Sequence, residues 1–246
     1  MSSFEPRLRW PVPSALAQQI IGERIESVDR RGKYILLGTR SGSLILHLGM
    51  SGSLRIVPAD STARKHDHID IVLNDQHCLR FRDPRRFGAL LWTQGDPHHH
   101  PLLASLGPEP LGPDFCGAWL HRRSRNRTAP IKTFIMNSRV VVGVGNIYAN
   151  EALFLAGIHP KRATGRLSES RCRTLAESIR RVLNEAIAHG GTTLRDFVDE
   201  TGRPGYFQQM LRVYGRESEP CHRCQRGIRL IRLGQRSTFY CPGCQH

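Results

Sequence analysis

Four cysteines near the end of the chain have the spacing of a metal site. They form two C-x-x-C pairs, Cys221–Cys224 and Cys241–Cys244, with sixteen residues between the pairs. Four thiolates at this spacing can close around one tetrahedral Zn²⁺ ion. We therefore predict one structural zinc in a small C-terminal ribbon, with these ligands: Cys221, Cys224, Cys241 and Cys244.

The chain that must position this site is strongly basic. Its 246 residues include 36 Lys and Arg against 21 Asp and Glu, which gives a formal net charge of +15. This excess favours a polyanionic partner, because cations that neutralise phosphates release condensed counterions. No apolar run approaches the ~20 residues of a membrane span, and the first residues do not resemble a signal peptide. We expect a cytoplasmic protein that contacts no membrane.

Short apolar runs between about residues 20 and 92 predict β-strands. The runs 33–37 and 43–48 are joined by Ser41-Gly42, which is a hairpin signal, and the run 68–73 partly alternates. Several short strands at close spacing indicate a β-sandwich.

Residues from about 112 to 200 have a helical pattern. Ser168 is a good N-cap, apolar residues then recur at helical spacing, and Gly190-Gly191 ends the helix. A shorter helix begins at Asn146 and ends near Gly157. Two helices joined by a compact turn resemble a helix-turn-helix variant. Residues 202–216 are rich in Gly and are predicted to be loop.

Six motifs, in this order, resemble bacterial formamidopyrimidine-DNA glycosylase of the Fpg/Nei family. They are His47–Gly52, Lys65–His68, Asp83–Gly88, Gly143–Tyr148, Pro204–Phe207 and the cysteine ribbon. The resemblance implies an α+β multidomain fold with three parts. These are an N-terminal β-sandwich over residues 1–93, a helical helix-two-turn-helix domain over 107–200, and a lesion-recognition loop with a zinc finger over 201–246.

The resemblance also implies an activity in base-excision repair. Members of the family excise oxidised purines (formamidopyrimidine and 8-oxoguanine) and cleave the abasic site by β,δ-elimination. The implied partner is double-stranded DNA containing oxidised bases, bound by a monomer near the bacterial nucleoid. Two residues match catalytic positions: Lys33 beside the nucleophile, and Arg236 at the tip of the zinc hairpin. A surface lysine and a surface arginine are the plain alternatives.

The resemblance assigns DNA contacts to further residues. Everting a base leaves a void, and an apolar wedge, a flat ring and a guanidinium can fill it. The matching DNA-contact residues are Met50, Arg85 and Phe87 for the void, His66, Arg127 and Asn146 elsewhere, and Gly205 and Tyr206 over the lesion base. The alternatives are core packing for Met50 and Phe87, Asn126 in place of Arg127, an N-cap role for Asn146, and a tight turn at Gly205.

The chain departs from the family at its start. The family opens with Met-Pro-Glu-Leu-Pro-Glu-Val-Glu-Thr, then completes a helix and a strand, whereas this chain begins Met-Ser-Ser-Phe-Glu-Pro. The family's nucleophile is the amine of its N-terminal proline, and the adjacent Glu handles protons at the opened sugar. We therefore expect a sandwich without its first helix and strand, and a chain without the two central catalytic groups.

Three hypotheses remain open. In the first, the start is misassigned or the chain is a fragment, and the complete protein is a bifunctional glycosylase and AP lyase. In the second, the chain is a non-catalytic remnant that binds damaged DNA. In the third, it is an endonuclease VIII-like glycosylase for oxidised pyrimidines. The motifs His47–Gly52, Asp83–Gly88 and Pro204–Phe207 favour the purine branch.

Overall fold

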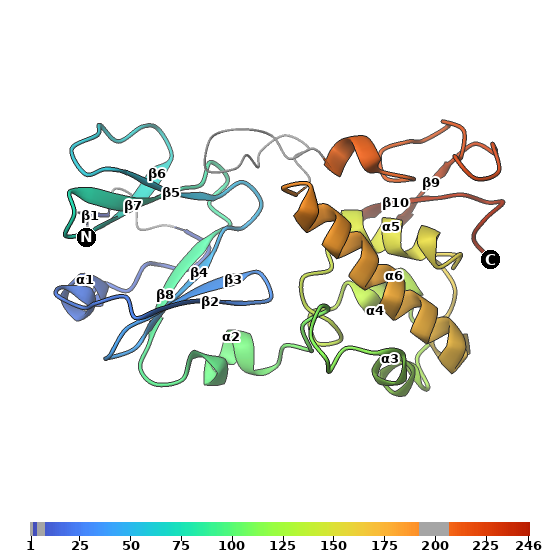
Figure 1. Ribbon diagram of the computed structural model, residues 1–246, viewed down its shortest axis with the longest axis horizontal. Coiled ribbons are helices and arrows are strands. Elements are labelled where there is room, and N and C mark those ends of the chain that lie inside the picture. Colours follow the sequence, from blue (N-terminus) through green and yellow to red (C-terminus); the bar gives the residue numbers. More distant parts are fainter. Residues whose placement is uncertain (1, 4–7, 192–206) are drawn as a thin grey trace. The chain divides into compact units, whose positions relative to one another are not determined.

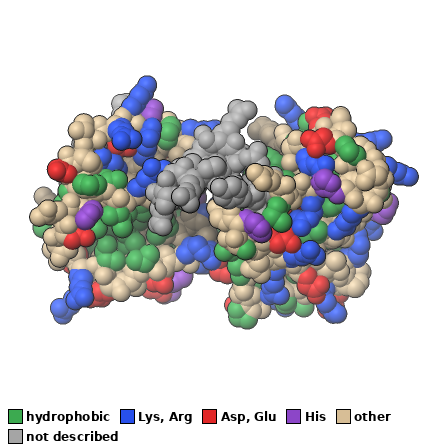
Figure 2. Space-filling model, turned by 45° about the horizontal axis from the view of Figure 1, so that its top comes forward, with side chains coloured by type: hydrophobic (Ala, Val, Ile, Leu, Met, Phe, Trp, Pro, Cys, Tyr) green, Lys and Arg blue, Asp and Glu red, His purple; other side chains and the backbone are tan. Residues whose placement is uncertain are grey.

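The computed structural model describes residues 2–3, 8–191 and 207–246 (Figure 1). These residues fall into two compact units, one within residues 1–104 and the other within 105–191 and 207–246. Lys and Arg side chains lie on the surfaces of both units, among fewer Asp and Glu (Figure 2). Each unit is described separately below.

The first unit is built from two four-stranded antiparallel sheets, which confirms the predicted sandwich. One sheet has the order β1 (Ser2–Ser3), β6 (Asp67–Val72), β7 (His77–Arg82) and β5 (Ser53–Pro58). The other has the order β2 (Ser27–Arg31), β3 (Tyr34–Gly38), β4 (Ser43–His47) and β8 (Ala89–Thr93).

Alternating apolar residues of the two sheets form one buried core. Leu37 and Leu46 come from β3 and β4, and Ile69 and Phe81 come from β6 and β7. Burial of such side chains stabilises the fold by about 1.5–3 kcal/mol each. The core fixes the register of each strand, because a slip by one residue would move its apolar side chains out of this core.

Short helices flank the sandwich. Helix α1 (Leu16–Ile20) lies in a stretch for which we predicted no element, and its one buried residue, Leu16, joins the core. After β8, a 3₁₀ turn η1 (Pro97–His99) and helix α2 (Pro101–Ala104) occupy the stretch around the three histidines.

The second unit begins with four helices around a separate core. They are α3 (Gly117–Ser124), α4 (Ile131–Ile135), α5 (Asn146–Leu155) and α6 (Glu169–Ala188), with a 3₁₀ turn η2 (Thr164–Arg166). The hydroxyl Oγ of Ser168 accepts a hydrogen bond from the N–H of Arg171, which confirms the predicted N-cap of α6. Gly190 and Gly191 follow the helix with φ of 70° and 90°, a conformation that favours glycine.

A two-stranded hairpin completes the second unit. Strand β9 (Arg229–Leu233) pairs with β10 (Arg236–Tyr240) through the turn at Gly234 and Gln235. A small core below the hairpin includes Phe154 of α5 together with Val213 and Ile228. The zinc ribbon and the helices therefore pack into one unit.

One loop differs from expectation. Phe207–Met210 forms a 3₁₀ turn, η3, within a stretch that we predicted to be loop. No helix among the described residues is long and apolar enough to cross a membrane.

Candidate functional site

Two loops of the first unit are joined by one buried carboxylate. Asp83 is fully buried, and its Oδ1 accepts hydrogen bonds from Ser51 Oγ at 2.7 Å and from the N–H of Arg85 at 3.2 Å. Its Oδ2 accepts from the N–H of Gly88 at 2.7 Å. Carboxylates that accept from backbone N–H groups form strong, charge-assisted hydrogen bonds. Asp83 therefore fixes the loop after β4 against the loop after β7.

Close backbone packing reinforces this junction. Gly49 has φ of 68°, and a Cβ there would lie 2.7 Å from the backbone of Phe87 and Gly88. A Cβ on Gly88 would lie 2.4 Å from the ring of Phe81. Only glycine allows so close an approach, which explains the glycines of the two motifs.

The residues of the predicted void-filling set lie on these two loops and are exposed. Met50 is 49% exposed and Phe87 is 46% exposed, so neither is a core residue. The guanidinium of Arg85 lies over the Phe87 ring, with 5.1 Å between its central carbon and the ring centroid. This contact is a cation–π interaction, worth about 0.5–1 kcal/mol at an exposed site. The structure therefore presents an apolar tip, a ring and a cation together on one pair of loops.

His66 lies beside the same junction. Its backbone has φ of 77°, and its carbonyl accepts a hydrogen bond from the N–H of Asp83 at 3.0 Å. Desolvation, followed by the charges of Lys65 and Arg82, lowers the pKa of the His66 imidazole. The lowered pKa favours the neutral ring, which can still donate one hydrogen bond to a phosphate.

Lys33 is exposed in the two-residue turn between β2 and β3, after Gly32 with φ of 59°. Its charge acts on His47, whose pKa is lowered first by burial and then by Lys33. The Nδ1 atom of His47 accepts a hydrogen bond from the N–H of Gly49 at 2.9 Å. His47 therefore lies within the electrostatic influence of Lys33 and is hydrogen-bonded to the loop that holds Met50.

We expect Asp83→Ala to destabilise the first unit by about 3 kcal/mol, because it leaves the Gly88 N–H and the Ser51 hydroxyl without the acceptor they share. Affinity for duplex DNA should fall as well, since both loops lose their common anchor. Urea unfolding and equilibrium DNA binding measure the two effects. Asp75→Ala is the matched control, because the Asp75 carboxylate accepts from one exposed N–H, that of His77. Equal effects of the two substitutions would contradict the anchoring role.

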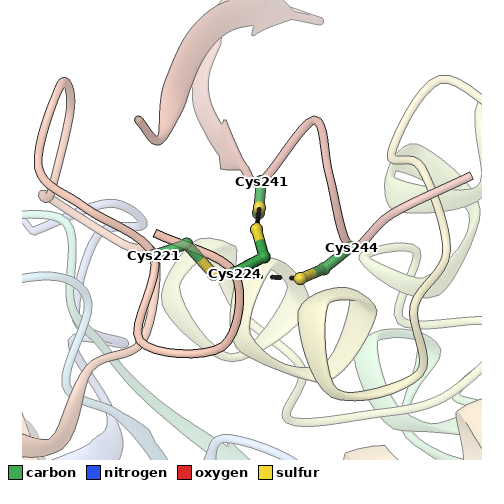
Figure 3. Close-up of side chains that lie close together, drawn as sticks. All are labelled: Cys221, Cys224, Cys241 and Cys244. Carbon is green, nitrogen blue, oxygen red and sulfur yellow. Dashed lines mark hydrogen bonds between the residues drawn. The ribbon is translucent and has the colours of Figure 1, made fainter. Parts of the chain in front are cut away.

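The four cysteines of the second unit meet in one place. Their sulfur atoms lie within 4.8 Å of one another (Figure 3). The Sγ atoms of Cys221 and Cys244 are 3.9 Å apart, and those of Cys224 and Cys241 are 3.3 Å apart. A tetrahedral ion with Zn–S bonds of ~2.3 Å requires sulfur atoms about 3.8 Å apart. The cluster therefore fits one structural Zn²⁺, as predicted, and is the one metal-binding group found among the described residues.

Backbone groups assist the thiolate form of one ligand. The pKa of the Cys224 thiol is lowered to about 7, chiefly by a hydrogen bond from the backbone of Arg226 and then by Cys241. Cys221 and Cys241 are fully buried beneath the ribbon and pack against Phe154. The metal site and the α5 helix thus share one core.

A buried lysine ties the hairpin to the helices. Lys132 of α4 is 1% exposed, and its Nζ donates hydrogen bonds to the Ser237 carbonyl at 2.9 Å and to Thr238 Oγ1 at 2.7 Å. Asn146 Nδ2 donates to the same Ser237 carbonyl at 3.1 Å. Asn150 Oδ1 accepts from the N–H of Phe239 at 2.9 Å. Strand β10 is therefore held by side chains of both α4 and α5.

This arrangement places two of the predicted DNA contacts relative to each other. Arg236 is exposed as the first residue of β10, directly before Ser237, so it projects from the anchored strand. Asn146 is the first residue of α5, where unpaired backbone N–H groups can bind a phosphate. The N-cap is Gly145 and not Asn146, so the N-cap alternative is wrong. The carboxamide holds the hairpin instead.

Arg127 lies in the turn after α3 and is exposed. Its Nε donates to the carbonyl of Arg123 at 2.9 Å, and its guanidinium carbon lies 5.9 Å from the Phe134 ring centroid. Asn126 beside it has φ of 59° and is also exposed. Both alternatives stay open, and charge favours Arg127 as the phosphate ligand.

Lys132 makes the stability of the second unit depend on pH. Burial, followed by the charge of Arg236, lowers the Lys132 pKa from 10.5 to about 8. The unfolded chain binds more protons than the folded one between these values, so stability rises with pH across this window. Relative to Lys132→Met, the native protein should gain about 3 kcal/mol in unfolding free energy between pH 8 and 10.5. Urea unfolding at a series of pH values, with zinc in excess, measures it. Parallel curves for the two proteins would refute the assignment.

Gly205 and Tyr206, predicted to cover the lesion base, lie outside the described residues. Sequence reasoning gave no role to Asp83, Lys132 or Asn150, although Asp83 and the glycines around it belong to a motif that we singled out. A charged residue directly after a strand and before a proline was the available signal for Asp83.

The fold and the two clusters define a class of zinc-containing proteins with a β-sandwich and a helix-two-turn-helix unit. Residues 2–90 match the formamidopyrimidine-DNA glycosylase N-terminal domain, and residues 106–198 match the formamidopyrimidine-DNA glycosylase H2TH domain. Residues 218–246 match a zinc finger found in FPG and IleRS. The chain belongs to the formamidopyrimidine-DNA glycosylase family.

Individual relatives cover nearly the whole chain. The formamidopyrimidine-DNA glycosylase of Thioalkalivibrio sulfidiphilus is 61% identical over 98% of this chain and 89% of its own length. The enzyme of Methylococcus capsulatus is 60% identical over the same shares. Among solved structures, Lactococcus lactis Fpg with a Fapy-dG containing DNA superposes with a TM-score of 0.89 at 33% identity, covering 99% of this chain and 90% of that one. The Thermus thermophilus MutM (Fpg) protein gives 0.83 at 40% identity, covering 91% and 84%.

Proposed function

We propose that this chain binds and recognises damaged DNA as the body of a glycosylase that excises oxidised purines. The observation that carries the proposal is the exposed set of Met50, Arg85 and Phe87 on two loops joined by Asp83. Such a set can enter the space left by an everted base and hold the stack open. Support comes also from the Lactococcus lactis relative, which was solved with DNA containing Fapy-dG and with DNA containing an abasic site.

The other proposed residues contact the DNA backbone, the reacting sugar or the everted base. His66 and Arg85 act from the first unit, and Arg127, Asn146 and Arg236 act from the second. Lys33 lies beside the reacting sugar, and Gly205 and Tyr206 cover the extrahelical base. Phosphate contacts of this kind position the duplex, while the lesion is read by the pocket and by the ease of eversion.

We propose three parts for this chain: a sandwich over 1–93, a helix-two-turn-helix domain over 107–200, and a recognition loop with zinc finger over 201–246.

We propose in addition that the complete active site cleaves the abasic strand by β,δ-elimination as a monomer near the nucleoid. An amine attacks C1′ of the sugar, the glycosidic bond breaks, and the base leaves with a proton from a neighbouring acid. The C1′–O4′ bond of the sugar then breaks and O4′ takes up a proton, which leaves an iminium at C1′. The carbon–nitrogen double bond acidifies the C2′ proton, and loss of that proton expels the 3′ phosphate. Loss of a further proton, from C4′, expels the 5′ phosphate, and we assign to Arg236 the role of stabilising the leaving phosphates.

Binding to damaged duplexes tests the proposal. Wild-type protein should bind a duplex with Fapy-dG or 8-oxoguanine at least tenfold more tightly than the undamaged duplex, about 1.4 kcal/mol. A stronger preference for oxidised pyrimidines would replace the purine assignment with the endonuclease VIII-like one. Equal affinity for damaged and undamaged duplexes would overturn lesion recognition.

The hairpin tip offers a second, residue-level prediction. Arg236→Gln should weaken duplex binding about tenfold or more, because it removes a charge-assisted phosphate contact. It should also reduce the salt dependence of binding by about one phosphate. Arg229→Gln is the matched control, since Arg229 is an exposed arginine at the base of the same hairpin. Fluorescence anisotropy over a salt series measures both. An equal loss in the two variants would remove Arg236 from the contact set.

A further inference from the structure

The outer face of the β1-β6-β7-β5 sheet carries a basic groove that none of the roles above uses. The groove has a volume of about 460 Å³ and is lined by β5, β7 and the segment from Pro58 to Asp67. The strand register places Ser53 opposite Arg82 and Arg55 opposite Arg80 on this face. Cations that face each other across neighbouring strands repel, so the pairing requires compensation.

Among the residues that the structure describes, aspartates compensate one of these arginines, Arg80. Arg80 is 8% exposed and binds Asp70 through two hydrogen bonds, Nε to Oδ1 at 2.8 Å and Nη2 to Oδ2 at 2.7 Å. Asp67 lies 3.7 Å from Arg80, and its Oδ2 accepts from the N–H of Arg64 at 2.7 Å. The Arg80 guanidinium also donates to the carbonyls of Ser61 and Thr62, which fixes the segment over the groove.

Three more guanidinium groups line the groove. Arg55, Arg64 and Arg82 form no ion pair with any carboxylate in the part of the chain that the structure describes. Arg64 and Arg82 are exposed and Arg55 is half-buried. Asp67 and Asp70 both lie against Arg80. The four arginines of the groove therefore exceed these two carboxylates by two positive charges. The hydroxyls of Ser53 and Thr62 add donors to the same lining.

We infer that this groove binds a phosphate group, supplied by the backbone of a nucleic-acid duplex. Several guanidinium groups that converge on a preformed hollow are the chemistry that recognises phosphate. The duplex is the favoured source because residues of the groove adjoin the loops described above along the chain. Arg82 directly precedes Asp83, and Arg64 lies two residues before His66. The duplex source rests on the proposed function, whereas the affinity for phosphate does not.

A paired charge-removal experiment tests the inference. The groove variant is Arg55→Gln with Arg64→Gln, and the control is Arg24→Gln with Arg40→Gln, two exposed arginines outside the groove. Binding of an undamaged duplex of about 20 base pairs, roughly two helical turns, is measured over a salt series. Inorganic phosphate is titrated calorimetrically into each protein without DNA. Circular dichroism melting confirms that each variant folds.

The groove variant should bind the duplex about tenfold more weakly, with a salt slope shallower by about one phosphate, while the control variant changes neither. If the groove variant loses the heat of phosphate binding but binds duplex as the control does, the groove binds the free phosphate ion. That result would overturn the duplex backbone as the source of the phosphate. A groove variant that matches the control in both assays would overturn the inference. Failure of wild-type protein to bind duplex would instead overturn the proposed function, and the phosphate titration would still test the groove.

Discussion

The polypeptide of residues 1–246 should give no covalent adduct when borohydride is added during incubation with duplex containing 8-oxoguanine or an abasic site. Its first residues are Met1, Ser2 and Ser3, so removal of Met1 exposes a primary amine of serine and not the secondary amine of proline. An α-amino group has a pKa near ~8 and can attack a sugar carbon only when it is aimed at it. Nothing in the described structure aims Ser2 at the DNA-contact loops: it pairs with Asp70 in β6.

A gain of function provides the sharper half of this test. An N-terminal segment that begins with the family's Met-Pro-Glu, grafted before Arg9, should create a trapped adduct if the rest of the site is intact. Enzymes commonly accelerate their reactions more than a thousandfold. The grafted protein should therefore give a covalent protein–DNA band on a denaturing gel, and the polypeptide of residues 1–246 should give none. The same graft with its proline changed to alanine is the control. An adduct formed by residues 1–246 alone would show that another amine in the chain serves as the nucleophile.

Loss of the zinc site should reduce duplex affinity on the order of 100-fold, about 2.7 kcal/mol. Structural zinc contributes about 10–16 kcal/mol to the folding of small modules, so the ribbon does not persist without it. Cys241→Ser removes one buried ligand, and the hairpin that presents Arg236 loses the core it shares with Phe154. Lys132 and Asn146 then lose the Ser237 carbonyl as an acceptor.

Metal content and anisotropy measured together decide this prediction. The native protein should contain one zinc per chain and release it to a chelator with loss of duplex binding. Cys116→Ser is the control, because Cys116 is an exposed free cysteine outside the cluster. A Cys241→Ser protein that keeps one zinc and full affinity would separate the ribbon from DNA binding.

Local patterns predicted most of the elements near the site. Helix α6 was predicted from its Ser168 cap, its apolar spacing and the two glycines after it, and it spans Glu169–Ala188. The strands β3 and β4 followed from two apolar runs around Ser41-Gly42. Helix α1 was missed because it has five residues, no side-chain cap and one buried side chain, which is too little for periodicity to register.

The contacts that shape the candidate site are long-range and were not visible in the sequence. Asp83 reaches Ser51 across 32 positions, and Lys132 reaches Thr238 across 106. A lysine in a basic chain resembles a surface residue until its burial is known, so its acceptors could not be inferred. The family resemblance supplied the candidate DNA-contact residues, and the structure added the residues that hold several of them in place.

The edges of the sandwich have a consequence for solubility. Strands β2 and β5 each lie at the edge of a sheet, where unpaired backbone groups could add a strand from another molecule. Charged side chains line β2 at Asp29, Arg30 and Arg31, and β5 carries Arg55 and ends at Pro58. Charge and proline on an edge oppose such pairing, and like-charged edges repel. The charged residues of β2 and β5 and the proline that ends β5 therefore oppose pairing of two copies of this protein through these two edges.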